Sequence, residues 1–343
     1  MSPVYKTDVI IIGAGPVGLF AVFQCGMLGL SCHVVDALPA LGGQCTALYP
    51  EKPIYDIAAH PEIMAGDLIT GLVEQAEPFA PEYHLNQQVT ALREDKDTGR
   101  FTVTTAQGVV IDAAAVFIAA GPGAFGPNKP PIKGIESFEN FSVHYMVGHK
   151  DIFAGQTLVI AGGGDSAVDW ALSLSDIAEK IYLVHRRDKF RAAPDSVARL
   201  NHLAETGKIE KCIPYQPYDL KGRNGELSAV TLRNLNGETR DIAADHLLCF
   251  YGLAQDLGPI REWGLNIEKY QIPIDSRTAQ TDRRGIYAIG DVATYDHKLK
   301  LITTGFAEAA QAAHHAFGIA RPDAALHFEY STTKGIPDIK DGT

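Results

Sequence analysis

The sequence predicts an α/β fold with two domains, and three observations lead to this prediction. The chain has 343 residues, which is too long for a single hydrophobic core of ordinary size. In residues 9–36, an apolar run of β-forming residues is followed by a glycine-rich turn and an apolar helical stretch. The same order recurs in residues 157–187. Buried parallel strands alternate with helices in this way, so we expect each segment to open a domain built on a parallel sheet.

The first glycine-rich turn follows four consecutive apolar residues, Val9 to Ile12, which suit a strand buried on both faces. Gly13, Gly15 and Gly18 have the G-x-G-x-x-G spacing. In this pattern the first glycine makes the tight turn, the second lets the backbone approach a pyrophosphate, and the third lets the helix pack on the strand. Asp36 ends the next strand, where a carboxylate can accept hydrogen bonds from ribose hydroxyls. The segment therefore predicts a dinucleotide site.

Composition and charge exclude several classes of protein. Hydrophobic residues make up 46% and charged residues 21%, which fits a soluble globular protein, and no apolar run is long enough to span a bilayer. The first strand begins close to Met1, so we expect no targeting peptide. Five scattered cysteines without a C-x-x-C pair favour a reducing cytoplasm. The net charge of −11 argues against nucleic acid as a partner. His314 and His315 are adjacent and share no helix face, so we expect no metal site.

Residues 41–57 follow Asp36 and are rich in glycine, proline and tyrosine without a helical period, which predicts an ordered loop. A long loop in a compact domain is usually functional. Tyr49 and Tyr55 are therefore candidates to contact a cofactor, and a packing role stays open for Tyr55. Cys45 has no second cysteine nearby, which favours a small buried thiol over a redox-active one.

A second glycine-rich turn follows the apolar strand of residues 157–161. It has the pattern G-x-G-x-x-A and opens a helix that we expect to run through Leu174; its residues are Gly162, Gly164, Asp165, Ser166 and Ala167. The chain has His185, Arg186 and Arg187 at the end of the next strand, where the first turn had its aspartate. Loss of the acid removes repulsion against a 2′-phosphate, and two guanidiniums add charge-assisted hydrogen bonds to it. This favours NADP(H) over NAD(H). Arg191 continues the basic patch, and a solvated basic turn is the alternative.

The rest of the chain alternates between strands, hairpins and helices. We expect a helix over residues 61–76, a hairpin over 101–111 and an apolar strand over 115–120. A second hairpin is predicted over 227–242, with a type I′ turn at Asn236-Gly237. A buried strand ends at Asp291, and an alanine-rich helix follows over residues 303–317.

Together, these motifs resemble the flavoprotein reductases with two dinucleotide-binding domains, over essentially the whole chain. The first glycine turn is similar to their FAD site, and I-G-D-V around Asp291 resembles the motif whose aspartate binds the ribityl chain. G-G-G-D-S-A and H-R-R-D-K-F-R resemble the thioredoxin reductase branch. The resemblance implies two Rossmann-like domains. An NADP(H) domain of residues 122–284 would be inserted into an FAD domain of residues 1–121 and 285–343.

One departure decides the branch. Thioredoxin reductases carry a C-x-x-C motif shortly before the second glycine turn, and here that place falls on Tyr145 to Gly148, Y-M-V-G. With the loop of residues 41–57 and the extended tail Y-S-T-T, the chain resembles the thioredoxin-reductase-like (type 2) ferredoxin–NADP reductases. The resemblance implies that Tyr49 stacks on one face of the flavin and that Tyr330 covers the other. It implies FAD contacts from Asp36, Gln44, Tyr49, Val89, Phe125, Asp291 and Thr332.

The resemblance implies a homodimeric ferredoxin–NADP(+) reductase that uses FAD, and the cysteine pattern places it in the cytoplasm. NADPH would deliver a hydride to the flavin, and the electrons would leave one at a time to ferredoxin or flavodoxin, without a catalytic side chain. Three alternatives stay open: a thioredoxin or peroxiredoxin reductase, an NADPH oxidase or flavin monooxygenase, and a non-enzymatic flavoprotein that senses NADP(H). A carrier-binding patch of Lys129, Lys133, Lys298 and Lys300 is a hypothesis, against which stands a simple solvated surface.

Overall fold

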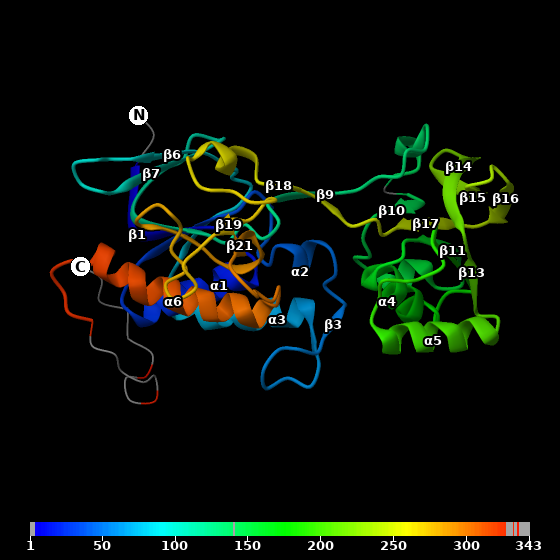
Figure 1. The fold of residues 1–343 in the computed structure, drawn as a ribbon, viewed down its shortest axis with the longest axis horizontal. Coiled ribbons are helices and arrows are strands. Elements are labelled where there is room, and N and C mark those ends of the chain that lie inside the picture. The colour runs from blue at the N-terminus through cyan, green and yellow to red at the C-terminus, as the bar shows by residue number, and fades with distance from the viewer. Residues whose placement is uncertain (1–3, 140, 327–331, 333–334, 336–343) are drawn as a thin grey trace. The chain divides into compact units, whose positions relative to one another are not determined.

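The computed structural model describes residues 4–139, 141–326, 332 and 335, and for residues 124–127 and 253–255 it describes the backbone alone. The chain forms two compact units, one of Met1–Phe125 with Gln255–Thr343 and the other of Gly126–Ala254. The second unit is inserted into the first, as predicted, and β9 (Ala124–Pro127) and β18 (Leu253–Asp256) contain the two crossings (Figure 1). We expected the second crossing near residue 284, but residues 255–284 belong to the first unit.

The first unit is built on a seven-stranded sheet in the order β5-β2-β1-β8-β7-β6, with β20 paired to β8. Strand β1 lies parallel to both β2 and β8. β8 joins two stretches that the sequence suggested as separate, because the alanines between them are buried and continue the strand. The strands are β1 (Val4–Ile12), β2 (Cys32–Val35), β5 (Glu82–His84), β6 (Val89–Glu94), β7 (Phe101–Thr105), β8 (Val110–Ile118) and β20 (Ile286–Ala288).

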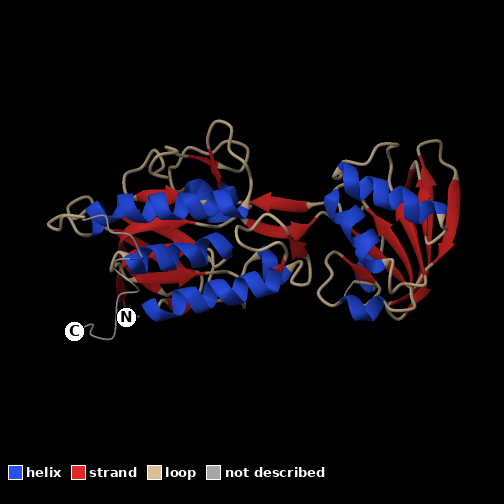
Figure 2. Cartoon of the chain, turned by 90° about the horizontal axis from the view of Figure 1, so that it is seen from below, coloured by secondary structure: helices blue, strands red, loops and turns tan. Residues whose placement is uncertain are grey.

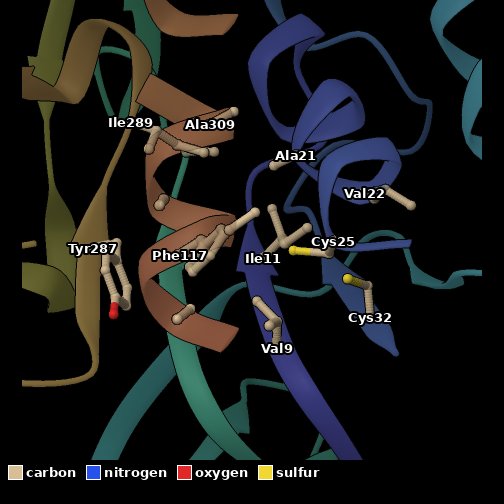
Figure 3. Packing of buried hydrophobic residues seen from close by; sticks show 14 of the residues in the cluster. Val9, Ile11, Ala21, Val22, Cys25, Cys32, Phe117, Tyr287, Ile289 and Ala309 are labelled. Atoms are coloured by element: carbon tan, nitrogen blue, oxygen red, sulfur yellow. The ribbon is translucent and has the colours of Figure 1, made fainter. Parts of the chain in front are cut away.

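Helices cover this sheet (Figure 2), and α1 (Pro16–Met27) packs between α3 (Ala65–Ala76) and α6 (Ile302–Ala320). Figure 3 shows Ile11 of β1 and Phe117 of β8 beside side chains of α1 and α6. Four alanines of α6 (Ala309, Ala312, Ala313 and Ala316) are fully buried in the same cluster, because small side chains let the helix lie close to the sheet. This packing places the glycine turn between β1 and α1.

The other face of the sheet is covered by chain that returns from the second unit. Leu257, Ile260 and Trp263 are buried in one cluster with Ile10 and Val116 of the sheet, which explains why residues 255–284 belong here. The elements of this segment and the turn after it are η4 (Gly258–Glu262), β19 (Ile272–Pro273), η5 (Gly290–Val292) and β21 (Ala293–Thr294).

The predicted loop of residues 41–57 contains more regular structure than expected. A short helix, α2 (Gln44–Ala47), begins after Gly43, and β3 (Pro53–Ile54) pairs with β4 (Ile63–Met64). Because β4 takes up residues 63 and 64, helix α3 begins later than predicted, and it is followed by η1 (Glu77–Phe79).

The second unit contains a five-stranded parallel sheet in the order β10-β17-β11-β12-β13 and an antiparallel sheet β14-β15-β16. The predicted hairpin is β15–β16, but its turn is not type I′: Gly237 has φ +84°, whereas Asn236 has no positive φ. Among the described residues, no helix of the chain is both long and apolar enough to cross a bilayer. The elements of the unit are η2 (Ile135–Ser137), β10 (Val143–His144), η3 (Lys150–Phe153), β11 (Thr157–Ala161), α4 (Asp165–Leu174), β12 (Lys180–Val184), α5 (Pro194–Glu205), β13 (Ile209–Cys212), β14 (Tyr215–Arg223), β15 (Glu226–Asn234), β16 (Thr239–Ala243) and β17 (His246–Cys249).

Candidate functional site

The three glycines of the first turn are needed for different reasons. Gly13 has φ +113°, and a Cβ atom there would lie 2.3 Å from the carbonyl oxygen of Ala119. At Gly18 a Cβ atom would lie 2.0 Å from the carbonyl oxygen of Gly13, so this glycine lets α1 pack against the turn. A Cβ atom at Gly15 would meet no atom within 4 Å. Gly13 and Gly18 are therefore required by the fold, whereas Gly15 borders open space.

That space is a cavity of about 440 Å³ within the first unit, at the carboxyl ends of β1 and β2. Ligands bind at this end of parallel α/β sheets, and the volume is in the range of ligand pockets. Most residues that the sequence predicted for the first nucleotide line the cavity. They are Gly13, Gly15, Asp36, Gln44, Tyr49, Val89 and Asp291.

The Asp36 carboxylate is held by the turn itself. The N–H of Ala14 donates to Oδ2 at 2.6 Å, and the N–H of Leu38 donates to Oδ1 at 2.8 Å. Burial raises the pKa of Asp36, and the two backbone hydrogen bonds act in the opposite direction. Each carboxylate oxygen has a further lone pair, so Asp36 can still accept hydrogen bonds from a ribose.

Tyr49 and Cys45 form part of the cavity wall beside α2. The Cys45 Sγ atom lies 3.9 Å from the Tyr49 hydroxyl oxygen, and burial raises the pKa of both groups. A thiol with a raised pKa is a weak nucleophile, in agreement with the predicted role of Cys45 as a buried thiol. Tyr55 is 66% exposed and does not line the cavity, so a packing role and cofactor contact are both unsupported for it.

A buried ion pair holds the turn that carries Asp291. Lys298 Nζ lies 2.6 Å from Glu308 Oε1, and the two side chains are 4% and 2% exposed. Lys298 also donates to the carbonyl oxygen of Gly290 at 2.6 Å, while Glu308 Oε2 accepts the N–H of Gly290 at 2.7 Å. Both polar groups of Gly290 are thus fixed by one pair, directly before Asp291.

This ion pair corrects the proposed lysine patch. Lys298 is buried and paired, so it cannot present its charge to a carrier protein, and Lys129 pairs with Glu139 at 2.7 Å. Lys133 and Lys300 are exposed, and Lys300 also lines the cavity. Lys298 is therefore excluded from the carrier-binding patch that the sequence suggested.

Three predicted FAD residues are not tested by the geometry. Phe125 lies in β9, where its side chain is outside the described part of the chain, and Tyr330 lies outside the described residues altogether. Thr332 is exposed. Their contacts with FAD stay predictions.

The second glycine turn lies between β11 and α4. A Cβ atom at Gly162 would lie 2.6 Å from the carbonyl oxygen of Phe250 and 2.8 Å from the Cβ atom of Ala167, so both positions must stay small. Gly164 is the N-cap of α4, which begins with Asp165 and Ser166. The turn therefore offers the helix N-terminus that suits a phosphate.

The predicted basic residues are tied to this turn. The N–H of Arg191 donates to the carbonyl oxygen of Gly163 at 2.7 Å, and the N–H of Ala193 donates to Asp165 Oδ1 at 2.9 Å. His185 follows β12 and its ring packs against the place where a side chain at Gly163 would lie. Arg186, Arg187 and Arg191 are exposed. The loop that carries these three guanidiniums is thus bound to the second glycine turn.

Residues 145–148 occupy the position of the C-x-x-C motif of thioredoxin reductases and contain no cysteine. The Tyr145 hydroxyl donates to Glu139 Oε1 at 2.7 Å. All five cysteines of the chain are buried and free. The second unit therefore has no exposed thiol that could exchange with a disulfide substrate.

A comparison with protein families matches residues 7–316 to the pyridine nucleotide-disulphide oxidoreductases. The chain belongs to this family. Proteins named ferredoxin–NADP reductase are similar to it over nearly their whole length: 60% identity with that of Rhodospirillum rubrum, covering 97% of both chains, and 59% with that of Rickettsia conorii, covering 96% of both. These relatives show that, within the oxidoreductase family, the chain belongs with the ferredoxin–NADP reductases, as its motifs predicted.

Solved structures of the oxidoreductase family agree with the fold. Thioredoxin reductase from Lactococcus lactis has a TM-score of 0.78 and 27% identity, covering 92% of this chain and 99% of that one. Bacillithiol disulfide reductase from Staphylococcus aureus has a TM-score of 0.74 at 19% identity, covering 92% and 99%, which shows the fold alone. The family implies FAD and NADP(H) as cofactors, as predicted.

The cavity of the first unit fits FAD. The backbone around Gly15 is open, a carboxylate lies where the adenosine ribose is expected, and an aromatic side chain lies on the wall. Sequence reasoning missed part of this site: Gln87, Gln88 and residues 257–260 also line the cavity. They lie far from the motifs in the sequence, and neither glutamine stands in a recognisable pattern.

We expect Gly15→Ala to leave the fold intact and to prevent FAD binding, because its methyl group would enter open space that the cofactor needs. The measurement is the ratio of flavin to protein absorbance after purification, with thermal unfolding of the apoprotein. Gly71→Ala on helix α3, where a Cβ atom also meets nothing within 4 Å, is the matched control. Full FAD occupancy in Gly15→Ala would contradict the assignment of this cavity.

Proposed function

We propose that this chain is a ferredoxin–NADP reductase, which transfers electrons between NADP(H) and ferredoxin through FAD. One observation carries the proposal: a fold shared with thioredoxin reductases has both dinucleotide turns but no exposed thiol, since all five cysteines are buried and free. Electrons would then leave the flavin directly for an acceptor, without passing through a disulfide. The names of the relatives at 58–60% identity support ferredoxin as this carrier, and flavodoxin is a second candidate.

The chain's own residues supply binding and orientation. When bound, FAD takes two electrons as a hydride from NADPH and returns them one at a time to a carrier. The bare backbone at Gly15 and the N-terminus of α1 would hold the pyrophosphate, and Asp36 would hold the adenosine ribose. Asp291, fixed by the neighbouring ion pair, would hold the ribityl chain, and Tyr49 would stack on the flavin.

The second unit would bind NADP(H). The N-terminus of α4 would hold its pyrophosphate, and Arg186 and Arg187 would bind the 2′-phosphate, because guanidiniums form charge-assisted hydrogen bonds with phosphate oxygens. Exposure of these arginines in the free chain agrees with binding a ligand from solvent. The assignment of FAD to the first unit and NADP(H) to the second follows from this division of residues.

The experiment is anaerobic stopped-flow mixing of the FAD-loaded protein, first with NADPH and then with ferredoxin. We expect rapid bleaching of the flavin by NADPH and rapid recovery of its colour with ferredoxin. Slow bleaching by NADPH would favour a protein that senses NADP(H). Recovery as fast with oxygen alone would favour an oxidase.

Tyr330 has a predicted role that can be tested in solution. If it covers the flavin face that NADPH must reach, Tyr330→Ala should keep FAD, strengthen the charge-transfer absorption with NADP(H), and accelerate oxygen-dependent oxidation of NADPH. Aromatic stacking contributes about 0.5–1.5 kcal/mol beyond area burial, weak enough for a nicotinamide to displace. An unchanged spectrum together with an unchanged oxidase rate would show that Tyr330 does not contact the flavin.

We also propose that the protein is a cytoplasmic homodimer. Five free cysteines suit a reducing compartment, and the family resemblance supports the dimer. Light scattering during size-exclusion chromatography should give twice the chain mass of 37.0 kDa.

A further inference from the structure

Two histidines and one glutamate meet at the edge of the first sheet, away from the glycine turn. In the register of β2 and β5, His33 lies opposite Glu82 and Val35 lies opposite His84. Because side chains alternate along a strand, His33, Glu82 and His84 point to the same face. His33 Nδ1 lies 2.9 Å from His84 Nε2, and His33 Nε2 lies 3.5 Å from Glu82 Oε2.

We propose that His33, Glu82 and His84 bind one divalent transition-metal ion, for which Zn²⁺ is the probe. One ligand atom from each of the three residues can be chosen so that the three atoms lie within 4.8 Å of one another. Among the described residues, this is the one group of histidine, cysteine or carboxylate side chains that meets this criterion. Two ligands of zinc, each about 2.0–2.2 Å from the ion, lie no more than about 4.4 Å apart. The two imidazole nitrogens, which share a hydrogen bond at 2.9 Å, lie within this limit, and the ion would displace the proton between them. The three ligand atoms lie within 4.8 Å of one another and would have to come slightly closer.

The surroundings of the three residues suit an ion that enters from solvent. The side chain of His33 is 11% exposed, whereas that of Glu82 is 50% exposed and free to turn toward the ion. The ring of Tyr5 packs against both imidazoles, with centroids 5.5 Å from His33 and 5.1 Å from His84, and so limits their rotation. An imidazole binds a metal ion through an unprotonated ring nitrogen, and each of the two rings has two nitrogens from which this ligand atom can come.

Such an ion would tie the edge strand to the nucleotide loop. The carbonyl oxygen of His84 accepts the N–H of Asp36 at 3.0 Å, and the N–H of Gln87 donates to the carbonyl oxygen of Asp36 at 2.8 Å. The ion would therefore hold β5 against β2 directly before the residues that line the cavity. We infer a structural role, since none of the three side chains lines the cavity itself. We expected no metal site because His314 and His315 share no helix face; His33 and His84 lie 51 positions apart, and no sequence pattern joins them.

The test is calorimetric titration of Zn²⁺ into the FAD-loaded protein after treatment with a chelator. We expect the wild type to bind one equivalent of Zn²⁺ per chain. His60→Ala should do the same, because His60 is an exposed histidine outside the group. His84→Gln should no longer bind this Zn²⁺ ion, and Glu82→Gln should raise the dissociation constant for Zn²⁺ by at least about 10-fold. Retained FAD and an unchanged unfolding temperature of the metal-free variants show that each is folded.

Three results would overturn the proposal. A wild-type protein that takes up no Zn²⁺ would show that the histidines only share a hydrogen bond. Zinc binding that survives both His84→Gln and Glu82→Gln would place the ion elsewhere. Loss of Zn²⁺ binding in His60→Ala would also place the ion elsewhere. Because Glu82 is half exposed, its glutamine variant decides the question even if His84→Gln fails to fold.

Discussion

Replacing Arg186 and Arg187 together by alanine is expected to raise KM for NADPH by roughly two or more orders of magnitude. A hydrogen bond to a charged group contributes about 1.5–3 kcal/mol, so the loss of two such groups gives an effect of this size. KM for NADH should barely change, because NADH has no 2′-phosphate. Steady-state kinetics with both cofactors provide the measurement.

Arg223→Ala is the matched control for the arginine pair, since Arg223 is an exposed arginine at the end of β14 in the same unit. It should leave both KM values unchanged. Equal losses with NADPH and NADH in the double variant would mean that Arg186 and Arg187 stabilise the loop instead of selecting the phosphate.

Lys298→Met is expected to have the largest effect on the first unit. It leaves the Glu308 carboxylate buried without its partner, and breaking a buried ion pair in this way costs about 3–5 kcal/mol. It also removes the hydrogen bond to the carbonyl oxygen of Gly290, so the turn before Asp291 should hold FAD less well. Thermal unfolding and the FAD content after purification measure the two effects separately.

A second variant separates stability from positioning. Lys298→Met/Glu308→Leu removes both charges, and replacing a buried pair by apolar side chains is often neutral for stability. We therefore expect it to regain thermal stability while FAD binding stays weak, because Gly290 has lost both partners. Lys96→Met, at an exposed lysine, should behave like the wild type. Normal FAD affinity in the double variant would show that the pair does not position the turn.

The local motifs could be predicted from the sequence because their requirements are local. A glycine turn between a strand and a helix fixes its own geometry, and Gly13, Gly18 and Gly162 are indeed positions where a Cβ atom would clash. The resemblance also led to the correct family, since the absent C-x-x-C pair distinguishes two branches of one fold.

Contacts that form only in the folded chain could not be predicted in the same way. Lys298 looks like a surface lysine in the sequence, and only the folded chain places it against Glu308 and Gly290. The segment 255–284 has no motif that assigns it to a domain, and it joins the first unit by burying Leu257 and Trp263. In each case the interaction depends on tertiary packing, which a local pattern does not contain.

The proposed activity is tested most directly by a steady-state comparison of electron acceptors. The FAD-loaded protein and NADPH are supplied in turn with ferredoxin, flavodoxin, thioredoxin and oxygen, and the oxidation of NADPH is followed. We predict rapid turnover with ferredoxin, and none with thioredoxin, because thiol–disulfide exchange needs an accessible thiolate and every cysteine here is buried. Turnover with thioredoxin comparable to that with ferredoxin would contradict the account.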